Sequence, residues 1–486
     1  MKDTFEATRG PSPRALERLG RNLASISDRL LPDPFLLAIL LTLATGGLGI
    51  VLAGEAPGRM LRYWGTGVWD LLEFSMQMCL ILVTGYALAE TPLLRRLINW
   101  LASLPRSSAG AAALVCAVAC VTGALHWGLS VIMGALVARD TAVVAARRGI
   151  RIHYPLLGAC GYVGMLVWHG GLSGSAPLTV ATEGHFLADR IGVIPIDATL
   201  GSPLNLAVLA ALMVFLPLVA SRLNPSSPEQ CQAVPLKIMS AWAVAQRGGG
   251  RAPVLTVGEK AADAKQSAGV QRWTLASWLN TSPLFGVLLG GAALVWAVEL
   301  LVERTVAGGT FGIDLNVLNL IFLSLGLLLH GRPISYVRAV ERAAGATAGI
   351  ILQFPIYAGI LGMIRSSGLL ELGVGALVAA STPETFPLLA FLSGGLVNLF
   401  VPSGGGQWAV QGAILMEAAA RLGVSVPKTI MAFSYGDQWT NMIQPFWALP
   451  LLGVMRLRAQ QVMGYAAVLM LAATPIFLLA LWIMPA

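Results

Sequence analysis

The sequence predicts an all-α protein that crosses a membrane many times, and three observations support this prediction. Hydrophobic residues make up 56% of the 486-residue chain and charged residues 12%, about half the charged share of a soluble domain. Apolar runs of about 20 residues recur along the chain, and each is long enough to span a bilayer as a helix. The chain also holds 54 glycines, and small residues let membrane helices approach one another closely.

Charge and cysteine usage argue against several other classes of protein. The net charge is +8, but most basic residues lie between apolar runs, where they set orientation rather than bind nucleic acid. The five cysteines show no disulfide or metal-ligand spacing, so neither a metal nor another cofactor is expected. Residues 1–30 lack a cleavable signal and predict a cytoplasmic amphipathic helix, which lies either on the membrane face or in solvent.

Spanning runs follow one another along the rest of the chain. They are expected near residues 34–53, 70–89, 154–180, 200–221, 280–302, 313–330, 344–364, 427–452 and 460–484. Two further apolar stretches, at about 107–138 and 386–416, are long but rich in glycine. The polar segments between these stretches, such as 54–66 and the basic segment after residue 330, are expected to be loops.

Loop charges predict that the two glycine-rich stretches are re-entrant helical hairpins. Both flanks of 107–138, at 91–106 and 139–153, carry arginines, so the positive-inside rule places both on the cytoplasmic side. The segment 366–385 carries no Lys or Arg and is expected outside, whereas the loop after 427–452 is basic. Each stretch is therefore expected to return to the side from which it started.

This order of segments predicts two related halves. Residues 31–221 and 313–486 each read as span, span, hairpin, broken span and span, separated by a polar cytoplasmic linker at 222–276. The additional span at 280–302 inverts the second half relative to the first. Inverted repeats with interrupted helices at matching positions are typical of secondary transporters.

Four breaks in the apolar segments define the candidate site. Non-helical backbone at bilayer depth is tolerated where it is buried in protein or lines a cavity. Helix N-termini at such breaks present amide hydrogens and a partial positive charge to an anion. No arginine lies at the breaks, so a small monocarboxylate is the expected ligand, although any one glycine cluster could equally serve close packing. The candidate substrate-binding residues are His126, Ser130, Ser173, Ser175, Ser403, Gly404, Gly405, Gly406, Gln407, Asn441 and Gln444.

Asp437 is the strongest single candidate for a functional residue, because ionisable residues within membrane segments are functional by default. It is expected to carry a proton or help bind a cation, together with Thr440 and Asn398, unless it reaches interfacial water at the end of a span. His169 is expected to contact the ligand or to support a residue that does, and His126 to donate to a carboxylate or to a buried carbonyl. The tryptophans near the breaks are expected to pack helices rather than wall a pocket: Trp127, Trp408, Trp439 and Trp447.

Several motifs resemble the bacterial short-chain fatty acid transporter family over nearly the whole chain. They are LPDPFLLAILLTL (31–43), FSMQMCLILVTGYALA (74–89), WHGGLSGSAPL (168–178), VPSGGGQWAVQG (401–412) and YGDQWTNMIQPFWALP (435–450). The resemblance implies transport of acids such as butyrate or acetoacetate across the bacterial inner membrane. It also implies inverted repeats with re-entrant hairpins, an elevator motion in some relatives, and a homodimer.

By motif position, the resemblance supports Ser403–Gly406, Ser173, Ser175, Asn441 and Gln444 as residues near the substrate. Three residues depart from the expected family pattern. His126 stands where Asn is expected, Gln407 where His is expected, and Asp437 where Glu is expected. Asp437 thus keeps an acidic side chain at its position, whereas the polar residues of the two hairpins, His126 and Gln407, differ from those expected.

The expected function is secondary active transport rather than enzyme catalysis. Uptake of a monovalent anion against a negative interior costs about 2.3 kcal/mol per 100 mV, so accumulation needs at least one co-transported H⁺ or Na⁺. Cation-coupled symport by alternating access is therefore predicted. A passive facilitator or channel is the alternative, and a membrane-embedded hydrolase using Ser173 or Ser403 lacks a His–acid pair placed with either serine. Substrate chain length and the choice of cation stay open.

Overall fold

The computed structural model describes residues 34–225, 231–240, 274–308, 313–399, 401 and 403–485. Regular structure in these residues is helical, without a strand, which confirms the predicted all-α fold. Eight helical segments among them are long and apolar enough to cross a membrane. The predicted helix within residues 1–30 and most of the predicted linker lie outside the described residues.

Two stretches of chain carry the helices. The first contains α2 (Pro34–Val51), α3 (Pro57–Gly67), α4 (Leu72–Ala89), α5 (Pro92–Ser103), α6 (Ser108–Leu125), α7 (Trp127–Arg147), α8 (Tyr154–Tyr162), η1 (Val163–Leu166), η2 (Trp168–Gly170), α9 (Ser175–Ala181), α10 (Ala188–Ile191), η3 (Ile196–Ala198) and α11 (Pro203–Arg222). The second contains α13 (Leu275–Thr281), α14 (Pro283–Gly308), α15 (Leu315–His330), α16 (Pro333–Ala344), η6 (Gly345–Thr347), α17 (Ala348–Ser366), α18 (Leu369–Ala380), α19 (Phe386–Asn398), α20 (Gly404–Leu422), α21 (Val426–Thr440), η7 (Asn441–Ile443), α22 (Pro445–Met455) and α23 (Ala459–Ile483).

The order of elements from α2 to α11 recurs from α15 to α23. Each series has a span, a short helix, a second span, another short helix, a helical hairpin, a broken span and a final span. The hairpins are α6–α7 and α19–α20, and the broken spans are α8–η1–η2–α9 and α21–η7–α22. Helix α14 stands between the two series, as predicted for the run at 280–302. Inversion of one series relative to the other stays a prediction.

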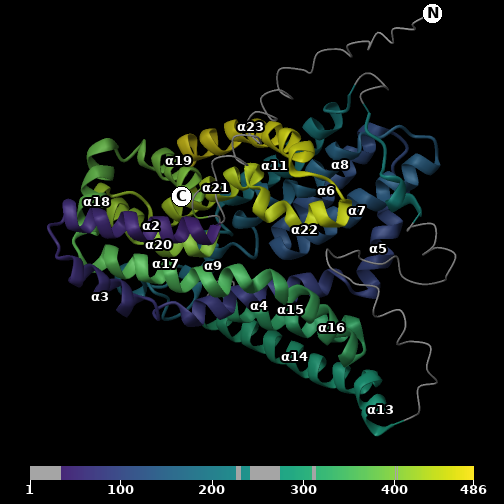
Figure 1. Ribbon diagram of the computed structural model, residues 1–486, viewed down its shortest axis with the longest axis horizontal. Helices are drawn as coiled ribbons and strands as arrows, with labels where there is room; N and C mark the ends of the chain where they lie inside the picture. The colour runs from purple at the N-terminus through teal and green to yellow at the C-terminus, as the bar shows by residue number, and fades with distance from the viewer. Residues whose placement is uncertain are drawn as a thin grey trace, which may run out of the picture.

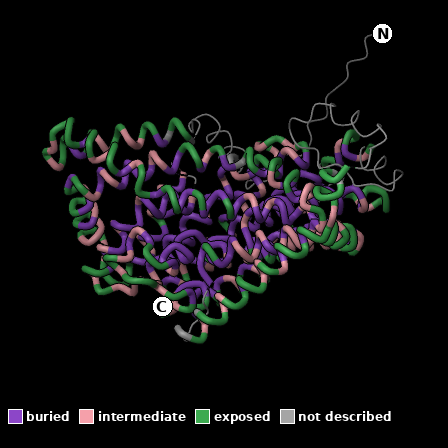
Figure 2. The backbone as a smooth tube through the Cα atoms, turned by 90° about the horizontal axis from the view of Figure 1, so that it is seen from below, coloured by how far each residue is buried: buried purple, intermediate pink, exposed green. Residues whose placement is uncertain are grey.

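The helices form two layers (Figure 1). The lower layer holds α3, α4 and α14 to α17, together with α2, which packs on α17; the upper layer holds α6, α7, α8, α11, α19 and α21 to α23, and α20 lies between them in contact with α17 and α21. Helices α4 and α17 contact α7 and α20, so the second spans of the lower layer face the second arms of the hairpins. Buried residues gather in the middle of the molecule and the outer helices are mostly exposed, as Figure 2 shows. The breaks are therefore enclosed by protein on several sides.

The expectation that the segments between spans are loops is wrong at four places. Short helices α3, α5, α16 and α18 occupy these segments. Three of them begin with a proline in the first turn (Pro57, Pro92 and Pro333), where its missing amide hydrogen costs nothing. They are amphipathic, as in α5, which buries Ile98 and Ala102 on one face. A search for spanning runs overlooks α3, α5 and α16 because they are too short and too polar to cross a bilayer, and α18 because it is apolar but only 12 residues long.

The basic segment expected to begin at Arg139 is also helical as far as Arg147, because α7 continues through it. Arg139 and Asp140 are buried, and Arg139 Nε donates to Asp140 Oδ1 at 2.7 Å. Pairing with the neighbouring acid explains how an arginine stays inside a packed helix, where a lone charge would be costly.

Glycines bring each hairpin close to the broken span of the same series. A Cβ atom on Gly134 of α7 would lie 2.0 Å from the carbonyl oxygen of Gly161 on α8, and one on Gly436 of α21 would lie 2.0 Å from that of Phe391 on α19. Both distances are shorter than any real contact, so a larger residue at either glycine would separate the backbones. These contacts fix where each break lies against its hairpin.

Candidate functional site

The tip of the first hairpin is formed by one residue, His126. Its backbone is extended, and its Nδ1 accepts hydrogen bonds from the amides of Gly128 (3.1 Å) and Leu129 (3.3 Å). The ring is fully buried, against Gly85 of α4 and 4.3 Å from the ring of Phe322 on α15. His126 therefore caps the first turn of α7 with an unprotonated Nδ1, a role that neither sequence expectation included.

Two serines predicted to bind substrate complete this tip. Ser173 Oγ accepts from the amide of Trp127 at 2.9 Å, which ties the first broken span to the hairpin. Ser130 Oγ donates to the carbonyl of Ala119 at 2.9 Å and joins α7 to α6. The first amides of α7 thus already have acceptors within the protein, so a carboxylate would have to displace Ser173 or His126 to reach them.

These contacts give a prediction for the two serines of the first break. Ser173→Ala leaves the buried amide of Trp127 without an acceptor, and we expect a loss of about 1–3 kcal/mol in stability. Ser175→Ala is the matched control, because in the described part of the chain Ser175 Oγ contacts only the weak acceptor Met78 Sδ, at 3.6 Å. Thermal unfolding of purified protein in detergent measures both. Equal stability of the two variants would contradict the capping role of Ser173.

The tip of the second hairpin is built around Ser403 and three glycines. Ser403 Oγ accepts from the amide of Gly406 at 3.3 Å, and its carbonyl accepts from the amide of Gln407 at 2.7 Å. Among the residues that the structure describes, no acceptor contacts the amides of Gly404 and Gly405. These two amides are therefore the candidate anion donors at the N-terminus of α20.

Close packing explains the glycines at this tip. A Cβ atom would lie 2.6 Å from the Trp168 ring if built on Gly404, 2.8 Å from the Phe74 ring if built on Gly405, and 2.6 Å from the Tyr357 ring if built on Gly406. The tip thus reaches the first broken span, α4 and α17 together. Gln407 instead faces its own hairpin, where Nε2 donates to the carbonyl of Gly394 at 2.7 Å.

Oxygen atoms converge at the second broken span, around Asn398. Its Nδ2 lies 2.9 Å from the carbonyl of Asp437, 2.9 Å from Thr440 Oγ1 and 2.8 Å from Asn441 Oδ1. One amide nitrogen has two hydrogens for these three oxygens. Gln444 Nε2 donates to the Asn398 carbonyl. The structure thus places five predicted residues in one cluster with the oxygen-rich character of cation sites at broken helices.

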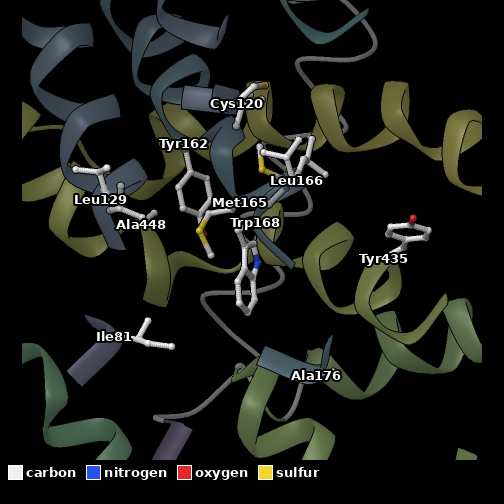
Figure 3. Packing of buried hydrophobic residues seen from close by; sticks show 14 of the residues in the cluster. Ile81, Cys120, Leu129, Tyr162, Met165, Leu166, Trp168, Ala176, Tyr435 and Ala448 are labelled. Atoms are coloured by element: carbon white, nitrogen blue, oxygen red, sulfur yellow. The ribbon is translucent and has the colours of Figure 1, made fainter. Parts of the chain in front are cut away.

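A buried acid–histidine pair joins the two broken spans. Asp437 Oδ2 lies 2.6 Å from His169 Nδ1, and both side chains are fully buried. The amide of Ala176, at the start of α9, donates to His169 Nε2 at 3.0 Å, so the ring proton is on Nδ1 and points at Asp437. Trp168, which precedes His169 in the chain, and Ala176 both belong to the buried core drawn in Figure 3. His169, left open by the sequence, is thus the direct partner of the predicted coupling acid.

The charge of Asp437 has little compensation. His169 is the only ion-pair partner that the described residues give it, and a ring holding one proton is neutral. Asp437 Oδ1 is buried without a hydrogen-bond partner in the described structure. In the described structure Asp437 thus has one neutral hydrogen-bond donor, His169, and one carboxylate oxygen without a partner.

An apolar cavity of about 420 Å³ lies between the two layers, against the tip of the first hairpin, and it is open on the side of Leu352 and Leu449, which are exposed. Trp127 and Trp447 line it with their ring centroids 5.2 Å apart, together with Gln353 of α17. The expectation that these two tryptophans serve packing alone is therefore incomplete. Sequence reasoning did not single out Gln353, and none of the predicted substrate-binding residues is among those that line the cavity.

Comparison with known sequences finds one family and two close relatives. The family model described as Short chain fatty acid transporter matches residues 15–484. Relatives from Escherichia coli (strain K12) and Haemophilus influenzae (strain ATCC 51907 / DSM 11121 / KW20 / Rd) are both named "Putative short-chain fatty acid transporter". They are 37% identical over 464 residues and 35% identical over 475 residues, and each match covers 96% of this chain and 99% of the relative.

Comparison with solved structures finds the same fold in two transporters. The Alcanivorax borkumensis YdaH transporter aligns with a TM-score of 0.56 at 17% identity, over 93% of this chain and 97% of that one. Neisseria gonorrhoeae MtrF, described as one of a class of antimetabolite efflux pumps, aligns with a TM-score of 0.52 at 15% identity, over 94% and 96% of the two chains. At these identities the likeness concerns the fold alone.

Proposed function

We propose that this chain, which belongs to the short-chain fatty acid transporter family, carries small monocarboxylates into the cell together with a cation. Family and relatives indicate the transport of short-chain fatty acids by a multi-pass membrane protein. The observation that carries the coupling is the buried His169–Asp437 pair. It joins the two broken spans, and none of the described residues gives it a compensating positive charge.

A proton is the cation that suits Asp437 best. Oδ2 already accepts from His169, whereas Oδ1 is buried and open to a proton without the loss of an existing hydrogen bond. Proton uptake at His169 Nε2 would instead break the bond to the amide of Ala176. Na⁺ would need several oxygen ligands, and the cluster around Asn398 is the alternative place for it.

The substrate carboxylate is proposed to bind at the hairpin tips, where amide donors and small polar side chains replace a fixed cation. Gly404 and Gly405 at the N-terminus of α20 offer donors, and Ser173 and Ser403 lie at the two breaks. One negative charge and one proton would then cross together as a neutral pair, which removes the cost of working against the membrane potential.

Alternating access is proposed to move the hairpins and broken spans against the layer of α2, α4 and α17, as an elevator. The glycine contacts of the second tip with Phe74 and Tyr357 lie on that boundary. An inverted second half, a cytoplasmic N-terminus in an inner membrane and a homodimeric assembly belong to the same proposal.

Uptake of labelled butyrate into proteoliposomes tests the coupling. We expect accumulation above that of protein-free liposomes under an inward proton gradient, and its loss when a protonophore removes that gradient, because the carboxylate anion alone is repelled by a negative interior. Accumulation driven by a Na⁺ gradient at uniform pH would identify Na⁺ as the coupling ion, with the Asn398 cluster as its proposed site. Equal rates with and without either gradient, and no stimulation by acid on the opposite side, would show a passive channel instead.

A further inference from the structure

The cavity between the two layers has the character of a site for a hydrocarbon chain. Its wall contains Leu82 of α4, Ile132 of α7, Leu352 of α17 and the rings of Trp127 and Trp447. Apolar pockets with a few placed polar groups are the usual form of small-molecule sites. The cavity touches the hairpin layer and the opposite layer, so its occupant would contact both.

We propose that this cavity holds the tail of the transported acid, and that the protein therefore binds acids longer than butyrate. This inference rests on the proposed function. The volume of 420 Å³ equals about fourteen water-sized volumes of about 30 Å³ each. Butyrate has six non-hydrogen atoms and octanoate has ten, so the cavity has room for both.

Gln353 supplies a polar group between the cavity and the second hairpin tip, where the carboxylate is proposed to bind. Its Oε1 accepts from the hydroxyl of Tyr357 at 3.1 Å, which orients the amide. Within the described structure no acceptor contacts Nε2, and Gln353 lines the cavity, so two N–H donors are available to an anion. Tyr357 in turn packs against Gly406 at the second hairpin tip. Gln353 and Tyr357 thereby link a tail in the cavity to a carboxylate at that tip.

A chain of aromatic rings in contact connects the same cavity to the acid–histidine pair. The Trp127 ring lies 5.2 Å from that of Trp447 and 6.2 Å from that of Trp168, which stacks on His169 at 4.3 Å. His169 donates to Asp437. A tail that moves Trp127 therefore shifts the packing beside the coupling acid, which gives substrate and cation a physical route to influence each other.

Gly345→Leu tests the tail site by filling it. Gly345 lines the cavity, its backbone is helical (φ −57°, ψ −28°), and a Cβ atom there meets nothing within 4 Å. For the wild type, isothermal titration calorimetry is expected to show about fourfold tighter binding per added methylene from C4 to C8. In Gly345→Leu we expect affinity for hexanoate and octanoate to fall at least tenfold, and that for butyrate less than twofold.

Gly375→Leu is the matched control, because Gly375 is also helical with nothing within 4 Å of a Cβ atom, but lies on α18 away from the cavity. Leu352→Trp places a larger side chain in the same cavity, and this variant replaces Gly345→Leu in the experiment if Gly345→Leu misfolds. Identical chain-length profiles for the filled and control variants, or no acid binding by the wild type, would overturn the tail site. Binding with the expected profile but without transport would support the tail site and reject the proposed function.

Discussion

Asp437→Asn is expected to abolish accumulation of short-chain acids while leaving passive equilibration. Asparagine keeps the shape of the side chain and can accept from His169 Nδ1, but it cannot take up and release a proton. Without coupling, a monovalent anion at 100 mV, inside negative, settles about fiftyfold depleted inside. The ratio of internal to external labelled butyrate in proteoliposomes measures the effect.

Asp314→Asn provides the control for this experiment. Asp314 is also buried, and its Oδ1 caps α15 by accepting from the amide of Val317 at 2.8 Å. Asparagine is about as good a helix cap as aspartate, so this variant should accumulate butyrate like the wild type. If the Asp437→Asn protein accumulated butyrate as strongly as the wild type, Asp437 would not be the coupling residue.

The architecture could be predicted from the sequence because its signals are local. Hydrophobic length identifies the spans, and glycine and proline identify the breaks, since their cost in a helix is intrinsic. Amphipathic helices such as α5 were not predicted, because their apolar face is recognisable only once the element that it packs against is known. Arg139 was misplaced for a related reason: its burial depends on the adjacent Asp140, which hydropathy counts as a second charge rather than as a partner.

The candidate site could be predicted only in part. The importance of Asp437 follows from one acid in an apolar segment, but its partner His169 is 268 residues away in sequence and could not be identified without the fold. Gln353 lies on a span without a break, so nothing local marks it as part of a site. The serines at the breaks were identified, yet which of them face donors of the protein depends on packing between hairpin and broken span.

Gly436→Ala is expected to destabilise the protein and disrupt coupling together. The new methyl group would lie 2.0 Å from the carbonyl oxygen of Phe391, a backbone atom that cannot rotate away. Separating α19 from α21 also moves Asp437, the next residue, relative to His169. Overpacking costs about 1–3 kcal/mol in well-packed cores, and we expect a lower unfolding temperature in detergent together with reduced butyrate accumulation.

Gly375→Ala makes the same chemical change with the opposite expected sign. A Cβ atom at Gly375 meets nothing within 4 Å, so alanine there should stabilise the helix by up to about 1 kcal/mol through its higher helix propensity. The intrinsic preference is the same at both glycines, so the difference between the two variants isolates the backbone contact of α19 with α21. If both substitutions stabilised the protein, close approach would not be what requires glycine beside Asp437.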